Sequence, residues 1–199
     1  MKLIGLTGGI ATGKSTASKI LREMGVRVID ADQVSHQVLA DGSPYLAGIE
    51  ERFGSSMLIS PKKLNREALG KVIFSSPAKK KLLEDFLHPV IREEMEKEIQ
   101  QGELEGLPFM VLDIPLLIES SYWPERVDEI WLIDANEELQ KSRLHSRNGY
   151  TEDEALARIR AQLPMVEKRK VADQVFLNEG KIADLERQLR QAIKKNEKI

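Results

Sequence analysis

One short motif near the start of the chain constrains the fold more than any other feature. Residues 8–15 read Gly-Gly-Ile-Ala-Thr-Gly-Lys-Ser, which fits the pattern G-x-x-x-x-G-K-[ST] without a gap. In such a loop, glycines let backbone N–H groups turn inward around phosphate oxygens, and the helix that begins near the lysine adds its positive dipole end. A β-prone run at residues 2–7 precedes the motif, and apolar residues at helical spacing follow it. The motif therefore predicts a strand, a phosphate-binding loop and a helix that bind a nucleoside triphosphate.

Two side chains of the motif have specific expected roles. Lys14 can reach the terminal phosphates, and the hydroxyl of Ser15 can ligate Mg²⁺. The alternative is a tight glycine turn that binds no ligand. The strand and helix on either side of the motif make that alternative much the weaker one.

The rest of the chain predicts an α/β fold built on a parallel sheet. Strands buried in parallel sheets appear as continuous apolar runs, and helical segments alternate with them. About five such runs occur, at residues 2–7, 26–29, 109–113, 130–134 and 174–177. A mostly helical, charged insertion follows the second run.

The segment between the last two strands reads as a charged helical hairpin. Asn136 can cap a first helix that Asn148-Gly149 ends, and Thr151 with Glu154 can form a capping box for the next. From Lys181 onward apolar residues repeat at helical spacing, which predicts a helix that covers the sheet.

Composition excludes several functions. The net charge is −2, so no basic excess indicates nucleic acid as a partner. The absence of cysteine excludes disulfides, thiolate metal sites and cysteine nucleophiles. No apolar run approaches the ~18 residues of a membrane span, and the N-terminus has no signal-peptide regions. We therefore expect a soluble cytoplasmic protein with no membrane partner.

Three carboxylates stand at predicted strand ends. Asp30 and Asp32 close the second strand, where side chains two residues apart can share one face and one can act as a general base. A helix cap or a plain loop carboxylate is the alternative for both. Asp113 ends an apolar strand, so it is either a Walker B carboxylate that holds Mg²⁺ or an ordinary strand-end residue.

Three basic or titratable residues are weaker candidates. Arg143 and Arg147 lie four residues apart, so they share a helical face and can clamp phosphates; a solvated helix with ion pairs is the alternative. His88 precedes Pro89, which we expect to start a helix. A lone histidine of this kind is more often structural or exposed than catalytic.

Together these features are typical of small-molecule P-loop kinases, and the chain resembles one family, dephospho-coenzyme A kinase. The resemblance begins with Leu6-Thr7-Gly8-Gly9-Ile10, Gly13-Lys14-Ser15-Thr16 and Val28-Ile29-Asp30-Ala31-Asp32. Further matches follow in the same order up to Gly180: Asn65-Arg66, Leu69-Gly70, Ile73-Phe74, His88-Pro89-Val90-Ile91, Pro115-Leu116-Leu117-Ile118-Glu119, Gln140, Arg143, Arg147, Gln162, Lys168, Ala172-Asp173 and Asn178-Glu179-Gly180.

The resemblance implies an activity and a set of site residues. The family uses ATP and Mg²⁺ to phosphorylate the ribose 3′-hydroxyl of dephospho-coenzyme A. Asp32 matches the proposed base, Arg143 and Arg147 match lid positions over the triphosphate, and Arg66 and His88 match the coenzyme-binding helical domain. The implied phosphate loop consists of Gly8, Gly9, Ile10, Ala11, Thr12, Gly13, Lys14, Ser15 and Thr16.

The resemblance also implies a domain organisation. It predicts the P-loop NTPase fold of the nucleoside-monophosphate-kinase type, with a nucleotide-binding core at residues 1–35, 107–135 and 166–199. The helical coenzyme-binding insertion then covers residues 36–106, and the lid covers residues 136–165.

One departure from the family concerns the phosphate loop. The family usually has Gly-Ser or Gly-Thr before the glycine at position 13, whereas this chain has Ala11-Thr12. The extra methyl group stands where the backbone must bend, so we expect an altered nucleotide affinity and a retained phosphate cradle. The position of Asp113 is not reliably acidic in the family.

Two other functions stay open from the sequence alone. A P-loop kinase of another small acceptor, such as a nucleoside or nucleoside monophosphate, shares the sheet, loop and lid. A nucleotide-dependent switch is more remote, because neither an N-K-x-D nor an L-S-G-G-Q motif is present. The sequence makes no prediction of oligomeric state.

Overall fold

The structure, a computed structural model that describes residues 1–196, divides the chain into two compact units. The first unit contains Met1–Asp30 and the chain from Gly102 onward, and the second contains Ala31–Gln101. The second unit therefore begins directly where a strand of the first ends. The sequence placed these boundaries five residues later, at 35/36 and 106/107, against 30/31 and 101/102 here.

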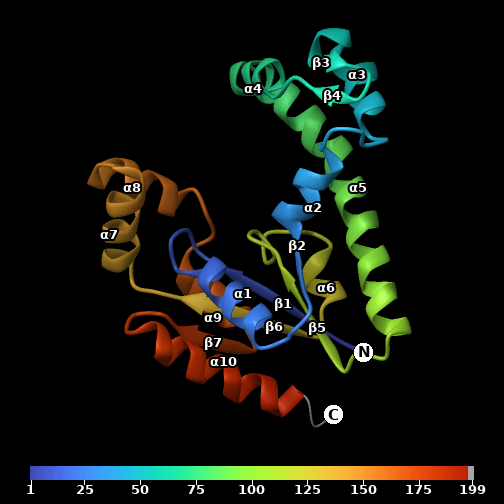
Figure 1. The fold of residues 1–199 in the computed structure, drawn as a ribbon. Helices are drawn as coiled ribbons and strands as arrows, with labels where there is room; N and C mark the ends of the chain where they lie inside the picture. Colours follow the sequence, from blue (N-terminus) through green and yellow to red (C-terminus); the bar gives the residue numbers. More distant parts are fainter. Residues whose placement is uncertain (197–199) are drawn as a thin grey trace. The chain divides into compact units, whose positions relative to one another are not determined.

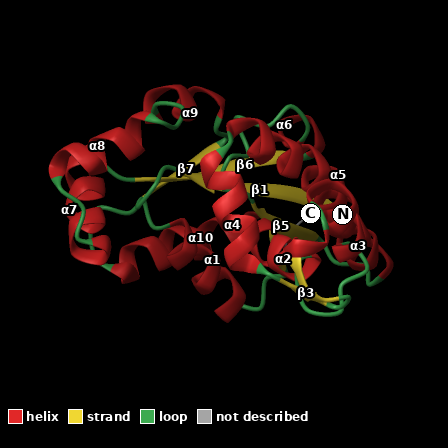
Figure 2. Ribbon diagram, turned by 90° about the horizontal axis from the view of Figure 1, so that it is seen from above, coloured by secondary structure: helices red, strands yellow, loops and turns green. Residues whose placement is uncertain are grey.

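The first unit is built on a five-stranded sheet of order β2-β5-β1-β6-β7, in which every neighbouring pair is parallel. The strands are β1 (Lys2–Gly8), β2 (Val28–Asp30), β5 (Phe109–Asp113), β6 (Glu129–Asp134) and β7 (Gln174–Leu177). Figure 2 shows β5, β1, β6 and β7 following one another across the sheet. Every residue of β5 and β6 is buried, as expected for strands covered on both faces. The predicted parallel α/β sheet is confirmed.

Helices cover both faces of this sheet. On one face, α1 (Lys14–Glu23) and α10 (Ile182–Asn196) pack against each other and against the strands (Figure 1). Apolar side chains from both helices and four strands form one buried cluster there, which includes the fully buried Trp131. On the other face, the backbone at Gly5 of β1 lies against Leu117 and Val127, near α6 (Trp123–Arg126). The predicted C-terminal helix over the sheet is confirmed.

Three further helices lie between β6 and β7 in the chain: α7 (Glu137–Asn148), α8 (Glu152–Arg160) and α9 (Met165–Val171). Asn136 caps α7 by accepting a hydrogen bond from the Leu139 N–H at 2.9 Å, and Gly149 ends it in the left-handed conformation. Thr151 and Glu154 form a reciprocal capping box at the start of α8. The hairpin caps predicted from the sequence are confirmed.

The second unit is mostly helical and has its own buried core. Its helices are α2 (Ala31–Val38), α3 (Leu46–Phe53), α4 (Arg66–Ser75) and most of α5 (Pro77–Leu104), with a short 3₁₀ turn, η1 (Ser55–Met57). It also contains an antiparallel pair, β3 (Leu58–Ser60) and β4 (Lys63–Leu64), which the sequence did not predict. Among the described residues, no helix is both long enough and apolar enough to cross a membrane.

Pro89 does not start a helix, because α5 runs through it. A proline in a helix interior removes one backbone hydrogen bond, and such a break costs about 3 kcal/mol when nothing offsets it. Here Leu83 and Leu87 on one side of Pro89, and Met95 and Ile99 on the other, are all buried. Their packing holds the helix together across the proline.

Candidate nucleotide-binding site

The phosphate loop joins β1 to α1 as the motif predicted. Gly8 is the last residue of the central strand, and Lys14 is the first residue of the helix. Two loop residues adopt positive φ angles, Gly13 at 99° and Ala11 at 58°. Among the described residues, Ala11 is the only one other than glycine with a positive φ. An L-residue held in that region is strained by about 1–2 kcal/mol, so the loop keeps a curvature that alanine does not favour.

Neighbouring side chains lie so close to the loop that a methyl group at either of two glycines would force them to move. A methyl group at Gly9 would lie 2.7 Å from the Met165 sulfur and 3.0 Å from the Gln140 amide nitrogen. One at Gly13 would overlap the Asn178 amide nitrogen. A side chain at either position would therefore displace a residue of α7, of α9 or the residue after β7, and Gly13 also adopts the positive φ of the turn.

Three carbonyl oxygens of the loop accept hydrogen bonds from side chains that come from far along the chain. Gln140 donates to the Ile10 carbonyl at 2.6 Å, while Gln162 accepts from the Ile10 N–H at 2.8 Å. Arg143 donates to the Ala11 and Thr12 carbonyls, both at 3.1 Å, and the Asn178 amide also donates to the Thr12 carbonyl, at 2.8 Å. The curvature of the loop is thus fixed without a ligand, which is the preorganisation that phosphate binding favours.

Lys14 forms an ion pair with a buried carboxylate at the end of β5. Its ammonium group pairs with the carboxylate of Asp113, to which the Ser18 hydroxyl also donates. Asp113 is 2% exposed at the end of β5, beside Asp30 at the end of β2. Burial raises the pKa of Asp113, although Lys14 and Ser18 oppose that effect. The strand-end residue that the sequence left ambiguous is therefore the partner of the loop lysine.

The two arginines of α7 differ sharply. Arg143 also donates to the Asn178 carbonyl at 2.7 Å, and its partial burial lowers its pKa. Arg147 is exposed, and its Nε donates only to the neighbouring Asn148 side chain, at 3.0 Å, among the bonds described. Arg143 belongs to the support of the loop, and Arg147 is positioned on the surface of the predicted lid. The role of Arg147 over the triphosphate stays a prediction.

The acidic pair does not lie on one strand. Asp30 ends β2 and accepts a hydrogen bond from Arg22 at 3.3 Å, whereas Asp32 lies in the first turn of α2, within the second unit. The expectation that both residues close the strand is wrong, because the helix begins at Ala31. The Asp32 side chain is exposed, and a carboxylate in the first turn is stabilised by the helix dipole.

The other predicted residues are exposed on their helices. Ser15 lies in the first turn of α1. Arg66 begins α4 and donates to the Leu39 carbonyl at 3.0 Å. His88 lies on α5. The structure thus unites the loop, Lys14, Ser15 and Arg143 in the first unit, and places Asp32, Arg66 and His88 in the second.

Comparison with known proteins decides between the kinase families that share this loop and sheet. A family profile for dephospho-CoA kinase matches residues 2–184. The chain belongs to the dephospho-CoA kinase family. The predicted family is confirmed.

Individual relatives agree with this assignment. The dephospho-CoA kinase of Carboxydothermus hydrogenoformans is 43% identical over 95% of this chain and 91% of its own length. The solved dephospho-CoA kinase of Campylobacter jejuni has a TM-score of 0.76 and 31% identity, over 98% of this chain and 97% of the other. Shikimate kinase from Acinetobacter baumannii shares the fold alone, with a TM-score of 0.53 and 18% identity over 98% and 94% of the two chains. The predicted P-loop fold class is confirmed as well.

Three residues of the site had no role in the sequence-based prediction. Gln140, Gln162 and Asn178 were noted as matches to the family, yet their contacts with the loop follow no periodicity or motif in a single sequence. Gln140 is 2% exposed and Asn178 7% exposed. A buried amide side chain must find hydrogen-bond partners, and these two find theirs in loop carbonyls.

Proposed function

We propose that this member of the family transfers the terminal phosphoryl group of ATP to the ribose 3′-hydroxyl of dephospho-coenzyme A, giving coenzyme A and ADP. The observation that carries the proposal is the preformed phosphate loop, with Lys14 at its end, in a chain that matches the family over residues 2–184. The kinase activity predicted from the sequence agrees with every named relative above, and nothing favours another acceptor or a nucleotide switch. The cytoplasmic location remains a prediction.

The chemistry assigned to the loop is electrostatic. Phosphoryl transfer leaves little covalent work to a protein, so positioning and charge supply most of the catalysis. Lys14 exchanges the Asp113 carboxylate for the terminal phosphates when ATP binds. Arg143 keeps the loop carbonyls turned away from the phosphates, and Arg147 reaches the transferring group when the lid closes. Closure also keeps water from accepting that group.

Asp32 is the proposed partner of the acceptor hydroxyl. A bond forms between the ribose 3′-oxygen and the γ-phosphorus while the bond from that phosphorus to the β–γ bridging oxygen breaks. The hydroxyl proton passes to the Asp32 carboxylate, and ADP leaves. Asp32 is exposed in the first turn of α2, so an acceptor hydroxyl can approach its carboxylate.

The residues present fit a magnesium ion that is bound together with ATP. Among residues 1–196, no group of three or more acidic, histidine or cysteine side chains forms a metal cage. Mg²⁺ usually binds through one or two protein oxygens plus phosphates and water, so the Ser15 hydroxyl is a sufficient protein ligand. When bound, the ion neutralises charge on the phosphate oxygens.

The direct test is mass spectrometry of the product formed from ATP and dephospho-coenzyme A. We expect one added phosphoryl group at the ribose 3′-position. A panel of nucleosides, nucleoside monophosphates and shikimate, read as ADP release, provides the comparison. Faster ADP release with any of these acceptors than with dephospho-coenzyme A would reject the proposed substrate.

The assignment of Asp32 is tested by Asp32→Asn. We expect kcat to fall by about 10²–10⁴, with a much smaller change in the acceptor KM, because a positioned base is worth that much. The lower figure is expected, since loose phosphoryl-transfer transition states need little early deprotonation. Asp30→Asn is the matched control: its partner Arg22 lies on the surface of α1, so we expect a weaker effect, partly on stability.

Saturating Mg²⁺ distinguishes the two possible roles of a carboxylate here. A damaged metal site is partly rescued by excess Mg²⁺, whereas a missing base is not. Near-parental kcat in Asp32→Asn, together with a large loss in Asp30→Asn, would assign the chemistry to Asp30 instead.

A further inference from the structure

Three glycines lie within helices of the described chain, and only one of them has no packing reason to be there. A methyl group at Gly48 of α3 would strike the ring of Phe86, and one at Gly102 of α5 would strike the Met110 side chain. At Gly70, in the middle of α4, a methyl group would meet nothing within 4 Å. Glycine in a helix interior is less stable than alanine, so the small residue at Gly70 has to serve something outside the fold of this unit.

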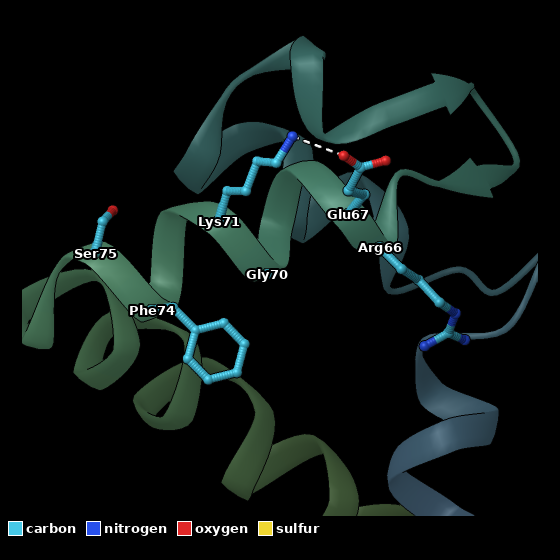
Figure 3. Close-up of a pocket in the computed structure, with 6 residues that line it drawn as sticks. All are labelled: Arg66, Glu67, Gly70, Lys71, Phe74 and Ser75. Atoms are coloured by element: carbon cyan, nitrogen blue, oxygen red, sulfur yellow. Dashed lines mark hydrogen bonds and ion pairs between the residues drawn. The ribbon is translucent and has the colours of Figure 1, made fainter.

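Gly70 forms the floor of a hollow on one face of α4. The hollow has a volume of about 640 Å³ and is lined by Arg66, Glu67, Gly70, Lys71, Phe74 and Ser75. Arg66, Gly70 and Phe74 follow one another at four-residue spacing, so they share a helix face. Figure 3 shows the Arg66 and Phe74 side chains on the same side of α4, with the bare Gly70 between them.

The ring of Phe74 is the most exposed large apolar side chain among the described residues, at 91%. A phenyl ring left in water loses the free energy that its burial would contribute, so such a ring indicates a ligand or partner. The spacing from Arg66 to Phe74 is about 12 Å along the helix axis, which leaves room for a flat bicyclic ring beside the phenyl group.

The charge around the hollow indicates an anionic occupant. Glu67 and Lys71 also line the hollow, but their charged groups pair with each other at 2.6 Å and point away from the Phe74 ring (Figure 3). Arg66 has no carboxylate partner among its described bonds, and its one described bond goes to the uncharged Leu39 carbonyl. The hollow therefore combines an aromatic ring with one uncompensated guanidinium group, the pair of groups that binds a base and its attached phosphates.

We propose that the Arg66–Gly70–Phe74 face of α4 binds the adenine base of the acceptor, with the base stacked on Phe74 and Arg66 directed to the acceptor's diphosphate. This inference rests on the proposed function, which supplies an acceptor that carries these groups. The flexible amide-containing arm of the acceptor is the other possible occupant. That arm needs hydrogen-bond partners, and two of the polar side chains that line the hollow, Glu67 and Lys71, already pair with each other.

The test compares variants on and off this face by acceptor KM at saturating ATP and by calorimetric titration with dephospho-coenzyme A. For Phe74→Ala we expect the acceptor KM and Kd to rise by about 5- to 100-fold, the usual value of one base–aromatic stack. The kcat and the KM for ATP should stay within about twofold, and Phe74→Tyr, which retains the ring, should keep most of the affinity. Ile59→Ala is the matched control, because Ile59 is an apolar side chain of the same unit, 65% exposed and outside the hollow.

Gly70 supplies a second, independent variant. Gly70→Leu fills the hollow and should raise the acceptor KM by about tenfold or more without lowering the melting temperature, because the side chain enters open space. A purely structural role would give the opposite result, with a lower melting temperature and an unchanged KM. Gly70→Ala, which adds only a methyl group in a helix interior, should melt about 2 °C higher.

Four outcomes would overturn the inference. An unchanged acceptor KM in Phe74→Ala would do so. The inference would also fail if Phe74→Ala weakened the binding of 4′-phosphopantetheine, which lacks the base, as much as that of dephospho-coenzyme A. The arm of the acceptor would then occupy the hollow. A change of oligomeric state in Phe74→Ala with unaltered kinetics would assign the face to self-association. A parent enzyme that neither binds nor phosphorylates dephospho-coenzyme A would reject the proposed function, and the inference with it.

Discussion

The phosphate loop and the α4 hollow are built in opposite ways. Side chains from residues 140–178 hold the loop by its carbonyl oxygens, and neighbouring atoms leave no space for a methyl group at Gly9 or Gly13. The hollow, in contrast, exposes nearly the whole ring of Phe74 and leaves open space above Gly70.

The contrast follows from what each region has to recognise. Phosphate oxygens are bound by N–H groups whose direction must be set before the ligand arrives, so the loop has to be rigid. A base is held by stacking on a flat surface, which needs area and little orientation. Substitutions around the loop should therefore alter stability and catalysis together, whereas substitutions in the hollow should alter only the affinity for the acceptor.

The largest effect is expected for Lys14→Ala. Loss of the charge that faces the terminal phosphates should lower kcat by about 10³-fold, at the upper end of what one preorganised donor contributes. Circular dichroism and thermal unfolding should show a retained fold, with a small loss of stability because Asp113 loses a partner. The double variant Lys14→Ala/Asp113→Asn should recover that stability and none of the activity. If Lys14→Ala alone melts far below the parent, the lysine is structural.

Arg147→Ala tests an exposed arginine of the first unit, on the same helix as the partly buried Arg143 that supports the loop. We expect kcat to fall by about 10²–10³ and the acceptor KM to change little, because the guanidinium contacts the transferring group only after lid closure. Unfolding should not change, since Arg147 is exposed and bonds only to Asn148 among the described residues. Single-turnover rates measure the effect, and an unchanged kcat would leave Arg147 as a solvated side chain.

Arg143→Ala should behave differently, although it lies one helical turn away. Three carbonyl oxygens, those of Ala11, Thr12 and Asn178, lose the hydrogen bond from Arg143, and of these Thr12 keeps the one from the Asn178 side chain. We expect the free energy of unfolding to fall by about 2 kcal/mol and the Kd for ATP to rise about tenfold. Urea unfolding and nucleotide titration of Arg143→Ala and Arg147→Ala side by side provide the comparison. Equal stability of the two variants would contradict the supporting role.

The smallest effect is expected for Ala11→Gly, and it is a gain. Relief of the strained φ of 58° contributes about 1–2 kcal/mol, and the greater freedom of glycine in the unfolded chain removes about 0.4–1 kcal/mol of that. The melting temperature should therefore rise by about 1–3 °C in calorimetry. A lower melting temperature would show that the Ala11 methyl group contributes packing that exceeds the strain.

Whether a feature of the fold or the site was predictable depends on how far apart in the sequence the residues that determine it lie. The strands and the caps at Asn136, Gly149 and Thr151 were predictable, because each depends on residues only a few positions apart. Pro89 was expected to start a helix, but packing on both sides of it lets α5 continue through the proline. Asp32 was expected to end a strand, but α2 begins at Ala31, directly after that strand.

The side chains that hydrogen-bond the phosphate loop could not be predicted from local sequence patterns. Gln162 lies 152 residues from Ile10, and Asn178 lies 166 residues from Thr12. Nothing in the spacing of a single sequence marks contacts across such distances. The β3–β4 pair was missed for a different reason: its strands are three and two residues long, too short for an alternating pattern to be seen.

The distance between the loop and its supports has a consequence during synthesis. The first strand, the loop and α1 leave the ribosome early, yet the amides and the guanidinium that shape the loop follow at residues 140, 143, 162 and 178. A nascent chain thus contains the complete motif long before the side chains that fix the conformation of the loop have been synthesised. We therefore expect nucleotide affinity to be among the last properties that the growing chain acquires.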